Sequence, residues 1–516
     1  MKRYTRTYAR RSLLHTVVFR TLSQAATFAS YVVLVRGMSE QSFGVLSLLY
    51  AMIPMLSTAF SLGIEQTLRR YQPEYLRSGQ LQTAAWLMRV GSSARLFSNL
   101  LVLSALLLAW NWVAPLFQLG PYRVEFALFC LLILLHFQSS LLQLSLSSHM
   151  LQAHSVGMTL LLPLVKLAGY SVLYHFHSLT LINAIGVDLL GYCAMYLGLR
   201  IAHARHCAAP AVPGEPVGVA AVSREERKRL WRYSLYNNFN DAGTMLLTSR
   251  SDNFFIAALI NPVATGAYSF YNRLSEMASQ ILPVRQFGNV IQPLFFAVPK
   301  EQAAMRIPRY FTLLMNSALA LQLPITAYAV AYHREVVDLL FDGKFFETSW
   351  MMAVVMGFAT VNRIAEPVGL VAQYEEQAAV ILKSKILVVY NVLTMLAFVP
   401  LWGIYGAAVS TGSSQIFKNL YIWWHVRRTA RWTNFGAVLS MTALIWGGAI
   451  GACIALKALI GAHHLLNLGS GGLICGLAAL LYLRSPAISD SDRELIGSIL
   501  HGKERRALLW LGLSRP

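Results

Sequence analysis

The sequence predicts an all-α, polytopic membrane protein with about fourteen transmembrane helices, in two halves of roughly six helices each plus a C-terminal pair. The first observation is composition: 56% of the 516 residues are hydrophobic and only 13% are charged, whereas soluble proteins carry about a quarter. The second is a series of apolar segments that can each cross a bilayer. The third is a strong bias of lysine and arginine toward alternate connecting segments.

Each predicted helix is an apolar segment of about 20 residues, the length that crosses the hydrocarbon core of a membrane. Helices are expected because backbone groups in lipid must satisfy their own hydrogen bonds. The segments lie near residues 12–35, 43–68, 86–110, 125–147, 158–176, 181–200, 234–258, 265–297, 308–331, 350–372, 385–400, 405–426, 435–457 and 469–483.

The distribution of basic residues predicts the orientation. With the N-terminus in the cytoplasm, about 29 lysines and arginines fall in cytoplasmic segments and about 5 in outside segments, as the positive-inside rule requires. The outside residues are Arg36, Arg123, Arg334, Lys344 and Lys457. We therefore interpret the formal net charge of +20 as charge retained on the cytoplasmic side and expect no nucleic-acid partner. Both termini are predicted to be cytoplasmic.

The predicted helices group into a modular chain. We expect an N-terminal half at 1–200, a cytoplasmic linker at 201–233, a C-terminal half at 234–431, an additional helix pair at 432–483 and a basic cytoplasmic tail at 484–516. The linker ends in a run of basic residues, and this run is expected to contact anionic lipid headgroups.

A repeated pattern supports the two halves. Residues 251–278 contain the end of one predicted span, a short polar break and a new span whose residues Tyr268, Asn272 and Glu276 share one face. Residues 34–50 show the same layout, again with a glycine shortly after the break. Weak internal symmetry of this kind is typical of transporters, in which the substrate path lies at the interface between the repeats.

Three motifs resemble a known family. An aspartate near the end of a span (Asp252) is followed by a short loop and by Gly266 and Tyr268; LFDGKFF lies at 340–346, and GIYGAA at 403–408. In this order they resemble the Wzx-type polysaccharide-biosynthesis flippases of the multidrug/oligosaccharidyl-lipid/polysaccharide exporter superfamily, and the resemblance covers most of the chain. It implies a flippase fold and a lipid-linked saccharide as substrate, in a bacterial inner membrane.

Charged residues inside the predicted spans are the main functional signal, because a charge at the bilayer centre costs about 2.5–3.5 kcal/mol on insertion scales. The basic ones are Arg20, Arg89, Arg95, Lys166, Arg250, Arg273, Arg285, Arg363 and Lys418. The acidic ones are Glu65, Asp188, Asp241, Asp252, Glu276 and Glu366. Pairing within the protein is one interpretation. The other is a cavity whose surplus of basic residues attracts an anion, since arginine matches phosphate geometry.

The resemblance implies that this anion is the diphosphate of a polyprenyl-linked saccharide. The candidate cavity cations are Arg20, Arg95, Lys166, Arg273 and Arg285. The candidates for binding the saccharide are Asn237, Asn240, Tyr268 and Asn272. Asp241, Asp252 and Glu276 are candidates for coupling transport to a Na⁺ or H⁺ gradient.

The leading functional hypothesis is a non-enzymatic flippase that works by alternating access and supplies surface or extracellular polysaccharide synthesis. Its expected partners are the lipid-linked oligosaccharide, membrane lipids and polysaccharide polymerase or assembly proteins. A drug or metabolite exporter of the same superfamily is the first alternative, and an integral-membrane polymerase or ligase is the second. No phosphate-binding loop or zinc motif occurs in the sequence, so we expect no ATPase activity, cofactor or metal.

Overall fold

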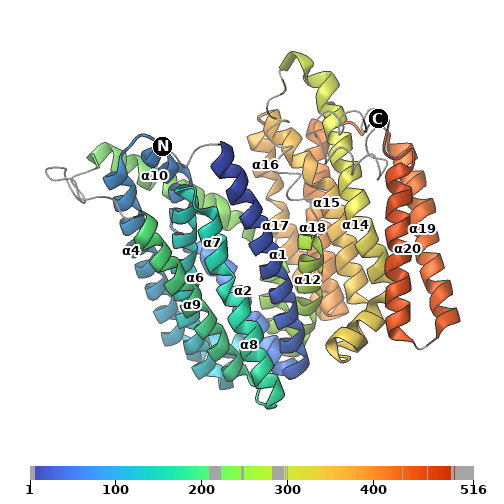
Figure 1. The fold of residues 1–516 in the computed structure, drawn as a ribbon, viewed down its shortest axis with the longest axis horizontal. Helices are drawn as coiled ribbons and strands as arrows, with labels where there is room; N and C mark the ends of the chain where they lie inside the picture. The colour runs from blue at the N-terminus through green and yellow to red at the C-terminus, as the bar shows by residue number, and fades with distance from the viewer. Residues whose placement is uncertain are drawn as a thin grey trace. The chain divides into compact units, whose positions relative to one another are not determined.

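The computed structural model describes residues 6–207, 222–245, 249–281, 300–432, 434–461 and 463–489, together with Phe296, Val298 and Arg493. These residues form helices and turns and, within the ranges given, no strand (Figure 1). The chain divides into two compact units, Met1–Gly266 and Ala267–Pro516. The all-α class predicted from the sequence is confirmed.

Unit 1 is a bundle of long helices with shorter ones at the connections. In chain order they are α1 (Arg6–Gly37), α2 (Glu40–Ala59), α3 (Ile64–Arg77), α4 (Leu81–Leu108), α5 (Trp110–Leu116), η2 (Gly120–Tyr122), α6 (Arg123–Ser148), α7 (Gln152–Thr159), α8 (Leu161–His175), α9 (Leu181–Cys207), α10 (Arg224–Met245) and α11 (Ser249–Leu259). Its core lies where α6 packs on α9, with Phe129, Phe137, Ile185 and Leu199 buried.

Unit 2 begins at Ala267, within α12 (Pro262–Ile281), so this helix crosses the boundary between the units. Its helices are η4 (Lys300–Gln302), α14 (Ala303–Phe341), η5 (Phe346–Thr348), α15 (Met351–Tyr374), α16 (Ala378–Ser384), α17 (Leu387–Trp402), α18 (Ile404–Val426), α19 (Phe435–Ile460) and α20 (His464–Arg484). Figure 1 shows α19 and α20 beside α14, and the three share a buried cluster that includes Tyr332, Trp446 and Tyr482.

Ten helical segments in the described part of the chain are long and apolar enough to cross a membrane, so the protein is a multi-pass membrane protein. The predicted total of about fourteen stays a prediction, as does the division into symmetric halves. The ten segments are Val18–Gly37, Leu81–Leu108, Gly120–Ser148, Gln152–His175, Leu181–Cys207, Ala303–Phe341, Met351–Tyr374, Ala378–Trp402, Phe435–Ile460 and His464–Arg484.

The predicted span at 43–68 is divided into two helices. The first, α2, ends at Ala59, and Leu62 and Gly63 then adopt positive φ angles of 52° and 66°, which no helix continues through. The next helix, α3, starts at Ile64 and is amphipathic, with Leu68, Tyr71 and Tyr75 among its buried residues. Gly63 is required here, because a Cβ atom would lie 1.8 Å from the carbonyl oxygen of Ser234 on α10.

The two copies of the repeated pattern begin alike. Ser39 caps α2 by accepting a hydrogen bond from the backbone N–H of Ser42 at 3.2 Å, and Asn261 caps α12 by accepting one from Ala264 at 2.8 Å. Gly44 and Gly266 each lie five residues after their cap. They also face each other within unit 1, because a Cβ on Gly266 would come within 3.0 Å of the Gly44 Cα.

Candidate functional site

A buried ionic centre joins α2, α8 and α9 in unit 1. Lys166 on α8 lies 2.9 Å from a carboxylate oxygen of Asp188 on α9, and Asp188 is fully buried. The hydroxyls of Tyr50 and Tyr170 both donate hydrogen bonds to this carboxylate. The Lys166 ammonium also donates to the Tyr50 hydroxyl at 2.6 Å. Both charges are therefore compensated by partners on neighbouring helices, as a buried pair requires.

Aromatic rings complete the surroundings of Lys166. Its ammonium lies 5.0 Å from the ring centre of Tyr50 and 5.7 Å from that of Tyr192, within range of cation–π attraction. His136 on α6 packs edge-on against Tyr192 at 5.5 Å. We call the group Tyr50, Lys166, Tyr170 and Asp188 the Lys166–Asp188 centre.

Arg95 on α4 forms a second centre, and here the compensation is incomplete. The side chain is fully buried and lies with its guanidinium 4.2 Å from the ring centre of Phe137. One terminal nitrogen lies 3.4 Å from a carboxylate oxygen of Glu65 and donates to the Ser57 carbonyl at 3.4 Å. Within the described part of the chain, Arg95 Nε and Nη1 have no hydrogen-bond partner. Buried polar groups are normally hydrogen-bonded, so these two nitrogens require an explanation.

The polar stripe on α12 is bonded largely within its own helix. Arg273 donates to Glu276 at 3.0 Å, and the Asn272 amide donates to the carbonyl of Tyr268 at 2.9 Å. Tyr268 is almost fully buried, and Tyr271 donates to the carbonyl of Phe345 at 2.7 Å. The Arg273–Glu276 pair is partly exposed, so its charges are compensated at little energetic cost.

The remaining predicted residues that the structure describes lie on three different helices of unit 1. Arg20 is exposed on α1. Asp252 is fully buried on α11. The half-buried Asn237 donates to the Tyr233 carbonyl one turn earlier in α10 at 2.8 Å. Arg285 lies outside the described residues, as do the side chains of Asn240 and Asp241, residues 208–221 of the linker and residues 494–516 of the tail.

Among the described residues, several basic residues of the predicted spans are paired with an acid, which is one of the two interpretations given to these charges. The pairs are Arg95–Glu65, Lys166–Asp188, Arg273–Glu276 and Arg363–Glu366. Sequence reasoning missed Tyr50 and Tyr170. The available signal was the spacing, because Lys166 and Tyr170 on one predicted span, and Asp188 and Tyr192 on the next, are each four residues apart and share a helix face. Among the described residues, no group of three or more His, Cys, Asp or Glu side chains is placed to hold a metal ion.

Comparisons with known proteins identify a family and a fold. Residues 10–297, more than half of the chain, match the model of the family described as polysaccharide biosynthesis protein. The structure resembles the lipid II flippase MurJ in an inward closed conformation, with a TM-score of 0.65, 11% identity, and 93% of this chain and 99% of that chain covered. It also resembles an inward-facing multidrug resistance MATE family transporter of the MOP superfamily, with a TM-score of 0.54, 13% identity, and 80% and 98% covered. A search of curated proteins finds no match.

Proposed function

The chain belongs to the polysaccharide biosynthesis protein family, and from this premise we propose that it is a flippase for a polyprenyl-diphosphate-linked saccharide. It works in the bacterial inner membrane, with both termini in the cytoplasm, and supplies the synthesis of a surface or extracellular polysaccharide. A central cavity rich in arginine opens alternately to the two sides of the membrane. Polysaccharide polymerase or assembly proteins receive the product.

The observation that carries the proposal is the guanidinium of Arg95. Arg95 Nε and Nη1 lack partners among the described residues, and a phosphate oxyanion offers several acceptor oxygens to which buried guanidinium N–H groups can donate. The two nitrogens point to different sides of the guanidinium, so each would donate to a separate acceptor oxygen. Glu65 is 20% exposed and lies 3.4 Å away, so it compensates the charge only weakly. Arg95 has no exposed surface here, so phosphate reaches it in another conformation of the transport cycle.

The other proposed cations differ in how readily they can reach a ligand. Lys166 is fully engaged by Asp188 and the tyrosines, and it binds the diphosphate only if that pair opens. Arg20 is exposed and is available to a ligand without rearrangement. Arg273 and Arg285 complete the proposed set, with Asn237, Asn240, Tyr268 and Asn272 contacting the saccharide. Transport draws on a Na⁺ or H⁺ gradient through Asp241, Asp252 and Glu276.

The test of Arg95 uses purified full-length protein in proteoliposomes that contain a fluorescent polyprenyl-diphosphate saccharide. Arg95→Gln is expected to slow flipping by at least about tenfold, because a lost charge-assisted hydrogen bond is worth roughly 1.5–3 kcal/mol. Arg89→Gln is the matched control, since Arg89 lies on the same helix with its side chain exposed, and it should change the rate less than about twofold.

Two results would contradict the proposed role of the cations. If Arg95→Gln flips the substrate at the rate of the unmodified protein, Arg95 does not bind the diphosphate. If replacing Arg20, Arg95, Arg273 and Arg285 together with alanine also leaves the rate unchanged, the cationic cavity is rejected as a whole.

A further inference from the structure

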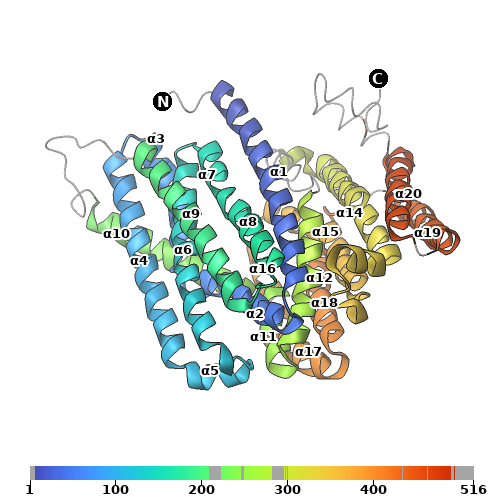
Figure 2. The ribbon, with the colours of Figure 1, turned by 60° about the horizontal axis from the view of Figure 1, so that its bottom comes forward.

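Two helices of unit 1, α3 and α10, pack against each other through tyrosines. The ring centres of Tyr71 on α3 and Tyr233 on α10 lie 5.2 Å apart in an edge-on arrangement, and Tyr75 stacks on Tyr71 at 6.4 Å. The Tyr75 hydroxyl donates to Glu226 on α10 at 2.7 Å. Figure 2 labels both helices, and Figure 1 shows α10 near the end of the unit where α4 begins.

The contact between the helices is fixed at further points. Ser234 donates a hydrogen bond to the Leu62 carbonyl, and Ser61 donates to the Asn238 side chain at 2.8 Å. Burial and the hydrogen bond to Glu226 raise the pKa of Tyr75 well above its ordinary value. Its hydroxyl therefore remains a donor throughout the physiological pH range. The α3–α10 corner is thus a built surface with defined geometry.

A pocket of about 480 Å³ opens beside this corner. Its lining residues are Tyr71, Glu225, Lys228, Arg229, Arg232, Tyr233 and Tyr236. Three cations face one carboxylate, so the lining carries a surplus of two positive charges. The guanidiniums are ordered by rings, because Arg229 lies 5.1 Å from the ring centre of Tyr71 and Arg232 lies 5.6 Å from that of Tyr236.

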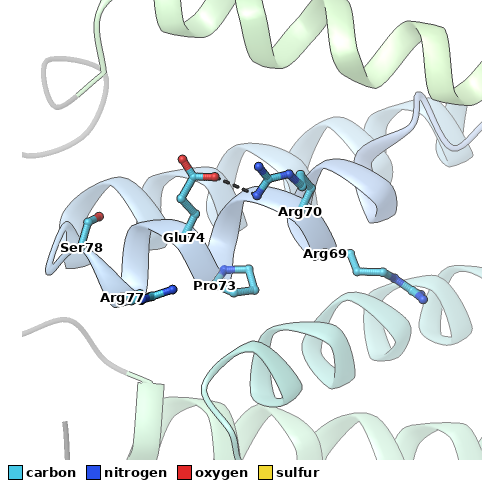
Figure 3. A pocket seen from close by; sticks show the side chains of 6 residues that line it. All are labelled: Arg69, Arg70, Pro73, Glu74, Arg77 and Ser78. Carbon is cyan, nitrogen blue, oxygen red and sulfur yellow. Dashed lines mark hydrogen bonds and ion pairs between the residues drawn. The ribbon is translucent and has the colours of Figure 1, made fainter. Parts of the chain in front are cut away.

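A neighbouring hollow on α3 is less suited to an anion. It is lined by Arg69, Arg70, Pro73, Glu74, Arg77 and Ser78, all from one helix. Figure 3 shows Arg70 turned toward Glu74, and the two are bonded at 2.8 Å. Both linings hold three cations and one carboxylate, but in the hollow one cation is already bonded to the carboxylate. The pocket at the corner is formed by two helices and includes three tyrosine rings.

We propose that the pocket lined by Lys228, Arg229, Arg232 and Tyr236 binds the phosphate headgroup of an anionic phospholipid of the inner leaflet. The arginine forks match phosphate oxygens, and Lys228 adds a point charge. Trp231 and Tyr236 are exposed on the same helix, at 52% and 65%, and these residue types concentrate at the membrane–water interface.

The test titrates the purified full-length protein, in a neutral detergent, with dioctanoyl phosphatidylglycerol and with dioctanoyl phosphatidylcholine, and reads binding by native mass spectrometry. Phosphatidylglycerol is expected to bind at least about tenfold more tightly. The variant Arg229→Gln/Arg232→Gln should remove most of that preference. Arg224→Gln/Arg227→Gln is the matched control, because it removes two exposed charges of the same helix that do not line the pocket.

Each result decides the proposal. Equal weakening by the two double variants would show diffuse attraction to a basic helix and overturn the site, as would equal affinity for the two lipids. Displacement of phosphatidylglycerol by millimolar inorganic phosphate alone would indicate a site for free phosphate instead. If Arg229→Gln/Arg232→Gln does not fold, Lys228→Gln, at an exposed position of the lining, must show a smaller loss in the same direction.

Discussion

Replacing Asp188 with asparagine is expected to lower the free energy of unfolding by about 3–5 kcal/mol, the cost of leaving a buried charge without its partner. Lys166 lies 2.9 Å from this carboxylate, and asparagine keeps the shape and one acceptor oxygen but removes the negative charge. The Tyr50 and Tyr170 hydroxyls also lose part of a shared acceptor. Chemical denaturation in detergent, followed by loss of monodisperse protein, measures the effect.

Two controls isolate the buried charge as the cause. Glu74→Gln makes the same chemical change in the exposed Arg70–Glu74 pair on α3, and such pairs contribute only about 0–1 kcal/mol. The double variant Lys166→Met/Asp188→Asn removes both charges and should be more stable than Asp188→Asn alone. An Asp188→Asn protein as stable as the Glu74→Gln protein would contradict the description of the Lys166–Asp188 centre.

Gly44→Ala should destabilise the protein by about 1–3 kcal/mol or more, since overpacking a close contact forces the backbone to move. The added Cβ would lie 1.9 Å from the carbonyl oxygen of Pro262, an atom of the backbone that cannot rotate away. The start of α2 would then separate from the start of α12. The loss should appear in thermal unfolding and, because the starts of α2 and α12 meet here, in the rate of flipping.

Gly186→Ala is the control for this substitution. Gly186 lies within α9, and no atom stands within 4 Å of a Cβ built there. Alanine is favoured over glycine inside a helix by about 0.5–1 kcal/mol, so this variant should be at least as stable as the unmodified protein. If both glycine variants behave alike, the close approach of Gly44 to Pro262 does not limit stability.

The helical class follows directly from composition and segment length. The position of a helix break can depend instead on a contact with a residue far away in the sequence. Residues 43–68 are apolar enough to suggest one span, yet the chain turns at Leu62 and Gly63 because Gly63 must admit the Ser234 carbonyl. That contact joins residues more than 170 positions apart. No pattern within a window of helix length contains it, so sequence periodicity joined two helices into one.

Sequence periodicity is limited in the same way for the candidate site, because it identifies pairs within one helix but not pairs between helices. Arg273–Glu276 and Arg363–Glu366 are three residues apart and visible as helical pairs. Arg95–Glu65 and Lys166–Asp188 need the packing of separate helices. The sequence therefore shows which cations and acids are available to pair, whereas only the structure distinguishes the well-compensated Lys166 from Arg95, whose guanidinium is only partly bonded.

The central claim is that the protein moves a saccharide whose lipid anchor is joined by a diphosphate. The most direct measurement compares, in proteoliposomes, the transfer of a fluorescent polyprenyl-diphosphate saccharide with that of the same saccharide on a neutral linkage, using a membrane-impermeant quencher. We expect the diphosphate compound to be transferred at least about tenfold faster than the neutral compound. Equal transfer of both, or export of a cationic drug without any flipping, would contradict it.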